Sequence, residues 1–220
     1  SYNCRQVDST SAYFASDGHQ GKNWFQMSQP EIVLYEDGSD NAEDIVYMIL
    51  GADRFIELKR QSTNSDLFQA INGATGVMVF AEGATNEPDT YTYHDPVGHT
   101  MVFFGFDADA GAAAGQIWTV DDAAGNVAYV GDATTGSTAI SNGYNGSGQI
   151  TDAYDTSDRR YSYTYTSGRL TQVKAETKSG GTWASPTGLS EVGKVDYSYY
   201  GAESYGEAGD LKLVTTTTPL

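Results

Sequence analysis

Hydrophobic and polar residues alternate along most of this chain with a period of two, the spacing of side chains on one face of a β-strand. Residues 32–35 and 45–50 are apolar runs separated by an acidic stretch rich in Asp, Gly and Asn, which predicts a hairpin with a long polar loop. Residues 53–60, DRFIELKR, alternate between apolar and charged positions and predict a half-exposed strand. The same pattern returns in residues 76–83 and 90–107. The chain is therefore predicted to consist mainly of short strands.

Two stretches have helical features. Residues 62–73, STNSDLFQAING, predict a short helix with Asp66 as its N-cap, ended by Gly73. Residues 110–115, AGAAAG, are rich in Ala, but the glycines within and after the run favour a loop. We therefore expect little helix.

A turn signature of Gly, a polar residue and an aliphatic residue recurs in the second half, and its last four glycines are 20, 20 and 21 residues apart. Such a spacing predicts one hairpin per repeat. We expect each Gly to supply a tight or positive-φ turn and the aromatic residues to align in cross-strand ladders. The turn residues are Gly115, Gly148, Gly168 with Arg169, Gly188 and Gly209, and the aromatic residues are Phe104, Phe106, Tyr144, Tyr161, Tyr163, Tyr165, Tyr197 and Tyr199.

The predicted fold is all-β, with antiparallel β-hairpin repeats in one continuous twisted or curled sheet. The 16 Tyr and 25 Gly agree with it, because Tyr favours strands and Gly favours the turns between them. A chain of 220 residues is compatible with one undivided β body. Within it, residues 1–90 are predicted to form an N-terminal β region that leads into the hairpin repeats of residues 91–220.

Residues 161–173, YSYTYTSGRLTQV, resemble a YD repeat, the unit of the RHS family, whose usual form is Tyr-x-Tyr-Asp-x-x-Gly-Arg-Leu-x-x-Val. Residues 197–214 resemble a second repeat, and residues 106–127 are similar to the family's Asp-Ala-x-Gly turns. The resemblance is clearest in residues 90–215. In the first repeat the turn is one residue shorter and Thr166 replaces the usual Asp. The matching residues there are Tyr163, Tyr165, Gly168, Arg169, Leu170 and Val173.

The resemblance implies a bacterial secreted or surface protein, or a relative of the animal adhesion proteins, with a sheet that spirals into a hollow shell. In toxin complexes of this family the shell encloses a toxic domain. Residues 95–98, DPVG, are similar to the motif at the self-cleaving end of such shells. Here they precede the repeats, so we predict an ordinary turn.

The charge of the chain limits its partners. The 12 Lys and Arg against 29 Asp and Glu give a formal net charge of -17, which repels nucleic acid and anionic membrane surfaces. No apolar run is long enough to predict membrane insertion. Cys4 stands alone, which excludes an internal disulfide. The resemblance to YD-repeat proteins implies a second copy of the chain, or the rest of a larger repeat protein, as the partner.

No motif in the sequence predicts catalysis. The chain lacks a Gly-x-Ser-x-Gly elbow and a phosphate-binding loop, and we predict a surface hairpin pair for His94 and His99. Asp107 and Asp109 are candidate calcium ligands, because alternate Asp residues can direct oxygens at one hard cation. A third ligand and a closing Glu are missing there, so a solvated turn is the favoured alternative. Solvated turns are also favoured over cation sites at Asp121 and Asp122, and at Asp152, Asp155 and Asp158.

Three functional hypotheses follow. The first is a non-enzymatic, extracellular structural protein of the bacterial cell surface, whose sheet edges or exchanged strands pair with other copies to form a fibre or filament. Residues 210–218, DLKLVTTTT, are a candidate donor strand. The second is a fragment of an RHS toxin-encapsulating shell. The third is a cell-surface carbohydrate-binding or carbohydrate-cleaving domain, which requires clustered aromatic residues that we instead expect in the sheet core.

Overall fold

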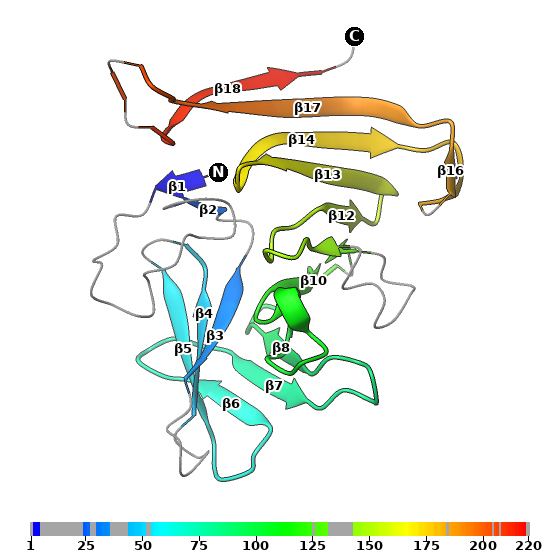
Figure 1. The fold of residues 1–220 in the computed structure, drawn as a ribbon. Helices are drawn as coiled ribbons and strands as arrows, with labels where there is room; N and C mark the ends of the chain where they lie inside the picture. Colours follow the sequence, from blue (N-terminus) through cyan, green and yellow to red (C-terminus); the bar gives the residue numbers. More distant parts are fainter. Residues whose placement is uncertain are drawn as a thin grey trace.

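A computed structural model describes residues 2–4, 24–26, 30–35, 44–51, 54–124, 126–131, 143–183, 185–203, 205–206 and 208–218. These residues are nearly all β, with a short 3-10 helix, η2 (Figure 1). The elements are β1 (Tyr2–Cys4), β2 (Trp24–Gln26), β3 (Glu31–Tyr35), β4 (Ile45–Ile49), β5 (Phe55–Arg60), β6 (Leu67–Ala70), β7 (Val77–Ala81), β8 (Thr90–His94), β9 (Thr100–Phe104), η2 (Gly111–Ala113), β10 (Ile117–Asp121), β11 (Val127–Val130), β12 (Asp152–Asp155), β13 (Arg159–Thr166), β14 (Arg169–Thr177), β15 (Gly180–Thr182), β16 (Ser185–Thr187), β17 (Ser190–Tyr199) and β18 (Leu211–Thr217).

One antiparallel sheet of 14 strands dominates the fold. Its order is β18-β17-β14-β13-β12-β11-β10-β9-β8-β7-β6-β5-β4-β3, so nearly every strand pairs with its neighbours in the chain. Two small two-stranded sheets, β1-β2 and β15-β16, accompany it. The prediction of one continuous, curled, antiparallel sheet is confirmed. The sheet also continues across residue 90, because β8 pairs with both β7 and β9.

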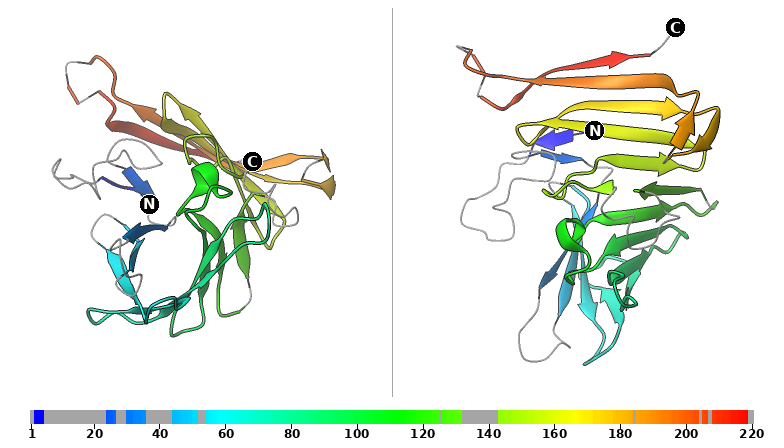
Figure 2. Two further views of the ribbon diagram at one scale, coloured as in Figure 1. Left: turned by 60° about the horizontal axis from the view of Figure 1, so that its bottom comes forward. Right: turned by 45° about the vertical axis from the view of Figure 1, so that its right-hand side comes forward.

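The first half of the sheet curls until β3 meets the loop that precedes β10. The N–H group of Ile32 donates to the carbonyl of Gly115 at 2.8 Å, and Glu31 forms an isolated antiparallel bridge with Gln116. Figure 2 shows β3 to β5 facing the green strands across this curl. Because β3 and β18 do not pair with each other, the sheet remains open.

Inward-facing side chains of the curl form the hydrophobic core. Strand β4 illustrates the pattern, since Val46 and Met48 have no exposed surface while Tyr47 between them is partly exposed. Helix η2 adds the buried Ala113. The largest fully buried side chains are Phe68, Phe103, Phe104, Met48, Leu58, Met78, Leu170 and Val46.

The last strands of the sheet have no such core. Leu170 of β14 is fully buried, but none of the residues described in β17 and β18 is buried. These two strands lie at the far end of the sheet from the curl (Figure 1). The fold therefore combines a packed curl with an extension whose outermost strand is exposed.

The predicted helix in residues 62–73 is wrong. Leu67–Ala70 forms β6, in which Phe68 is fully buried while Leu67 and Gln69 are exposed. This alternation suits a strand between β5 and β7, so sheet pairing overrides the local helical preference. The loop predicted in residues 110–115 contains the single turn of η2, held by the N–H of Ala113 donating to the carbonyl of Ala110 at 3.0 Å.

Candidate functional site

Three hairpin turns, after β8, β10 and β12, share a geometry built on an Asp. The Oδ1 atoms of Asp95, Asp122 and Asp155 each accept backbone N–H groups two and four residues later, at 2.8 to 3.2 Å. Asn145 forms the same turn before β12, with distances of 2.9 and 3.0 Å. Since alternate turns of an antiparallel sheet share a side, the three Asp residues define one side of the sheet, here called the Asp-turn side.

Hydrogen bonding changes the acidity of two of these carboxyl groups. The side-chain and backbone N–H groups of Asn126 lower the pKa of Asp122. Partial desolvation raises the pKa of Asp95, but hydrogen bonds from His99 and Val97 outweigh it, so the net pKa lies below its usual value. The ring of His99 contacts Asp95 at 2.7 Å. These carboxylates therefore serve as internal acceptors of the turns.

Asp107, the first candidate calcium ligand, is also engaged by backbone. Its carboxylate accepts the N–H groups of Asp89 at 3.1 Å and of Asp109 at 2.9 Å. Among the described residues, no group of three or more His, Cys, Asp or Glu is arranged to hold a metal ion. Both carboxylate oxygens of Asp107 are thus engaged by backbone donors.

All five predicted turn glycines have a positive φ, which glycine adopts without strain. Four of them lie on the side opposite the Asp turns, here called the Gly-turn side. Gly188 lies on the Asp-turn side instead, because the hairpin β15-β16 is inserted between β14 and β17. The regular spacing therefore does not make Gly188 equivalent to the others. The φ angles are 72° at Gly115, 71° at Gly148, 76° at Gly168, 60° at Gly188 and 101° at Gly209.

Successive turns on the Gly-turn side are linked. The side chain of Gln149 donates to the carbonyl of Gly168 at 2.9 Å. The guanidinium of Arg169 lies 5.7 Å from the ring centre of Tyr199 and packs against Gly209. These contacts join three turns along the sheet, which explains why a Gly is followed by a long polar side chain at two of them.

The repeat tyrosines of β13 and β17 do not lie directly opposite one another in the register of the described strands. Each repeat Tyr of β13 and β17 is paired across the strands with an Ala, Val or Leu. Nearer the curl, the rings of Phe104 and Tyr144 meet edge to face with their centres 6.2 Å apart. The ring centres of Phe106 and Tyr91 are 5.8 Å apart. The cross-strand pairs are Tyr161 with Ala175, Tyr163 with Val173, Tyr165 with Leu170, Tyr197 with Val214 and Tyr199 with Leu211.

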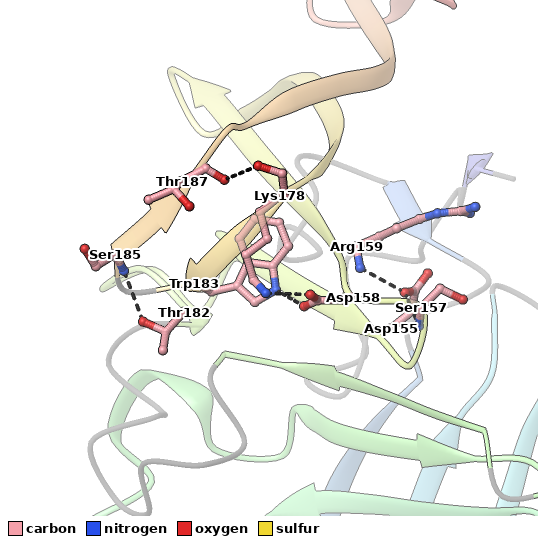
Figure 3. Close-up of polar contacts among 10 residues, drawn as sticks. Asp155, Ser157, Asp158, Arg159, Lys178, Thr182, Trp183, Ser185 and Thr187 are labelled. Carbon is pink, nitrogen blue, oxygen red and sulfur yellow. Dashed lines mark hydrogen bonds and ion pairs between the residues drawn. The ribbon is translucent and has the colours of Figure 1, made fainter.

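Trp183 anchors the hairpin β15-β16 to the turn between β12 and β13 (Figure 3). Its indole N–H donates to Asp158 at 2.9 Å, and the ammonium of Lys178 bonds the same carboxylate. The Lys178 bond is the main cause of the lowered pKa of Asp158. Lys178 and Arg160 lie 5.2 and 5.3 Å from the ring centre, and Tyr154 is 5.7 Å away. The indole of Trp183 is thus engaged by side chains of the same chain.

A buried carboxylate connects β13 and β14. The side chain of Glu176 is 7% exposed and accepts from Arg160 and Lys174, each at 2.7 Å. Desolvation raises the pKa of Glu176, but the two cations lower it by a larger amount. The net pKa therefore lies below its usual value. Because both carboxylate oxygens are paired with cations, this acid suits a structural role.

Strand β18, at one edge of the sheet, is exposed along most of its length. Leu213 and Val214 have 59% and 45% of their surface exposed, and the strand pairs only with β17 among the described residues. Lys212 is the only charged residue of β18, and it pairs with Glu203 at 2.6 Å. A strand with one unpaired edge and little charge can accept another strand.

The sequence carried a signal for the Asp turns that was missed. Residues 95–99, 122–126, 145–149 and 155–159 read DPVGH, DAAGN, NGSGQ and DTSDR, with Asp or Asn first and Gly or Asp fourth. The fourth residue has a positive φ in three of these turns, where a Gly or an Asp tolerates it, namely at Gly98, Gly148 and Asp158. Considered one at a time, the Asp residues suggested solvated turns or cation ligands.

No protein-family model matches the chain, and no curated protein matches its sequence. Among the described residues, no helix is both long and apolar enough to cross a membrane.

Proposed function

We propose that this chain is a non-enzymatic extracellular structural protein of the bacterial cell surface, a YD/RHS-like β-scaffold that self-associates through a sheet edge. The observation that carries the proposal is the contrast between the two edges of the 14-stranded sheet. The loop before β10 contacts β3, whereas β18 is exposed on both faces. Exposed edges are where β proteins join other strands.

The engagement of the polar groups supports a structural role. Asp95, Asp122 and Asp155 accept backbone N–H groups of their own turns, and Glu176 is held by two cations. Groups committed to such contacts are poorly placed for acid–base chemistry on a substrate. Trp183 is likewise bound to Asp158, which favours a hairpin anchor over a sugar-binding platform.

A shell fragment is the second candidate, and the curl of the sheet favours it. In a longer chain, the next strand in sequence would pair with β18 and continue the spiral. Both functions use the free edge of β18. In the scaffold a strand of another molecule pairs with it, whereas in the shell a later strand of the same chain does.

Sedimentation velocity of the purified 220-residue chain over a wide concentration range tests the scaffold proposal, with electron microscopy of the same samples. We expect concentration-dependent self-association, unchanged by a chelator. A chain that remains monomeric at every concentration would overturn self-association and favour the shell fragment.

A further inference from the structure

We propose that the strand which joins β18 is β18 of a second copy, paired antiparallel about a two-fold axis at Val214. The inference rests on the proposed function and specifies its contact. It makes the self-association isologous, so that the same seven residues of both copies form the interface. The product is a dimer with one sheet running through both molecules.

Contacts at the start of β3, the opposite edge of the sheet, disfavour a head-to-tail contact between β18 and β3. On β3, the N–H of Ile32 already donates to Gly115, and Glu31 is bridged to Gln116. The Gln116 side chain also contacts the carboxylate of Glu31. An incoming strand would have to displace the loop that closes the curl, whereas β18 pairs only with β17 among the described residues.

Charge favours a second copy at this strand. The chain carries a net charge of -17, so most pairs of surfaces from two copies bring carboxylates together. Strand β18, LKLVTTT, contains no carboxylate, and its Lys212 is already neutralised by Glu203. The long-range repulsion that remains is screened by salt over about 10 Å at 0.1 M. The dimer should therefore tighten as the salt concentration rises.

The length of the strand fixes the register. The longest antiparallel pairing of Leu211–Thr217 with the same strand of a second copy places Val214 opposite Val214, and the register shift of β18 at Lys212 then lies toward the two ends of the pairing. The register then places Leu213 opposite Thr215, and Lys212 opposite Thr216. Directly opposed side chains in antiparallel strands have Cβ atoms about 5 Å apart. The pairing covers Val214 and Leu213, whose side chains are exposed in the free chain.

Two charge variants at the axis test this geometry. In Val214→Lys or Val214→Glu alone, two like charges oppose each other, and the dimer dissociation constant should rise at least about tenfold. When the two variants are mixed in equal amounts, Lys opposes Glu and a heterodimer should form. Sedimentation velocity with one variant fluorescently labelled measures all three samples, and circular dichroism checks that each variant is folded.

Val97→Lys and Val97→Glu are the matched controls, because Val97 is 68% exposed in the turn between β8 and β9. They should associate like the unmodified chain, alone or mixed. If the Val214 variants are folded and still associate, the two-fold contact is wrong while the scaffold proposal survives. If they dissociate but the mixture does not recover, the register is wrong. A monomeric unmodified chain would overturn both proposals.

Discussion

The backbone N–H of Ile32 donates to the carbonyl of Gly115, 83 positions further along the chain, at a distance of 2.8 Å. This bond connects β3 to the loop before β10 and so holds the curl shut. Gly115 can approach because it lacks a Cβ, which would collide with the carbonyl oxygen of Ile32. Its φ of 72° is also in the region that favours glycine.

Replacing Gly115 by Ala should therefore destabilise the protein more than the same change at Gly168. Both glycines have similar φ angles, 72° and 76°, but a Cβ at Gly168 meets no atom within 4 Å. Gly168→Ala should cost about 1 kcal/mol of unfolding free energy from backbone strain, and Gly115→Ala about 2 kcal/mol more from the collision. Urea unfolding measures both variants. Equal losses would mean that the Ile32 contact does not constrain Gly115.

Asn145 offers a test of the five-residue turn. Its Oδ1 accepts two backbone N–H groups, and its Nδ2 donates to Gln149 at 3.0 Å. Asn145→Ala should lower the unfolding free energy by about 1 to 2 kcal/mol, because two backbone donors lose their acceptor. Asn145→Asp keeps the acceptor that the other turns use and should retain most of the stability. If the Asp variant is as unstable as the Ala variant, the acceptor is not what stabilises the turn.

A pair of leucines should separate the buried strand from the exposed one. Leu170 is fully buried in β14, whereas Leu213 of β18 is 59% exposed. Leu170→Ala should cost about 3 kcal/mol of unfolding free energy, since it leaves a cavity. Leu213→Ala should change the stability of the monomer by less than about 0.5 kcal/mol. Thermal unfolding at low protein concentration compares the two, and a large loss at Leu213 would contradict the exposure of β18.

Acid should weaken the fold below about pH 4, the ordinary range of Asp and Glu pKa values. Hydrogen bonds from Lys212 and nearby backbone lower the pKa of Glu203 to about 2, and Asn126 lowers that of Asp122. A carboxyl group whose folded pKa is depressed stabilises the fold above its unfolded pKa, and this contribution disappears as the pH falls through the folded value. Burial raises the pKa of Asp152, so the contribution of this group to stability changes with pH in the opposite direction.

Melting temperatures between pH 7 and about pH 2 measure this dependence. We expect a steady melting temperature above the ordinary carboxyl range and a decline below it. Glu203→Gln removes one of the depressed groups and should make the decline shallower. A melting temperature that rises on acidification would show that Asp152 outweighs the hydrogen-bonded carboxylates.

Period-two patterning predicted the strands well, because one face of each strand in the curl is buried. It placed β5 and the hairpin formed by β8 and β9. It failed for β6, a strand of four residues, where Asp66 and the residues after it suited a helix. Pairing with β5 and β7 decides between helix and strand for these residues, and the local sequence does not indicate this pairing.

The features that define the candidate site depend on distant contacts. Nothing near Gly115 in the sequence indicates that Ile32 returns to it. Alternation and β-propensity made residues 210–218 a candidate donor strand, but no local pattern predicts that the opposite edge, β3, is in contact with the loop before β10. The repeat tyrosines of β13 and β17 lie directly opposite aliphatic residues and not opposite one another, a register that the local sequence does not indicate.

No side chain is buried among the described residues of β17 and β18, and this should be detectable by hydrogen exchange in the free chain. Amides of these two strands should exchange through local opening that leaves the curl intact, since little apolar surface opposes their release. Amides in β4 to β9 should exchange far more slowly, near the rate of global unfolding. The free molecule therefore frays from its C-terminal strands, and a strand docked on β18 would slow exchange there first.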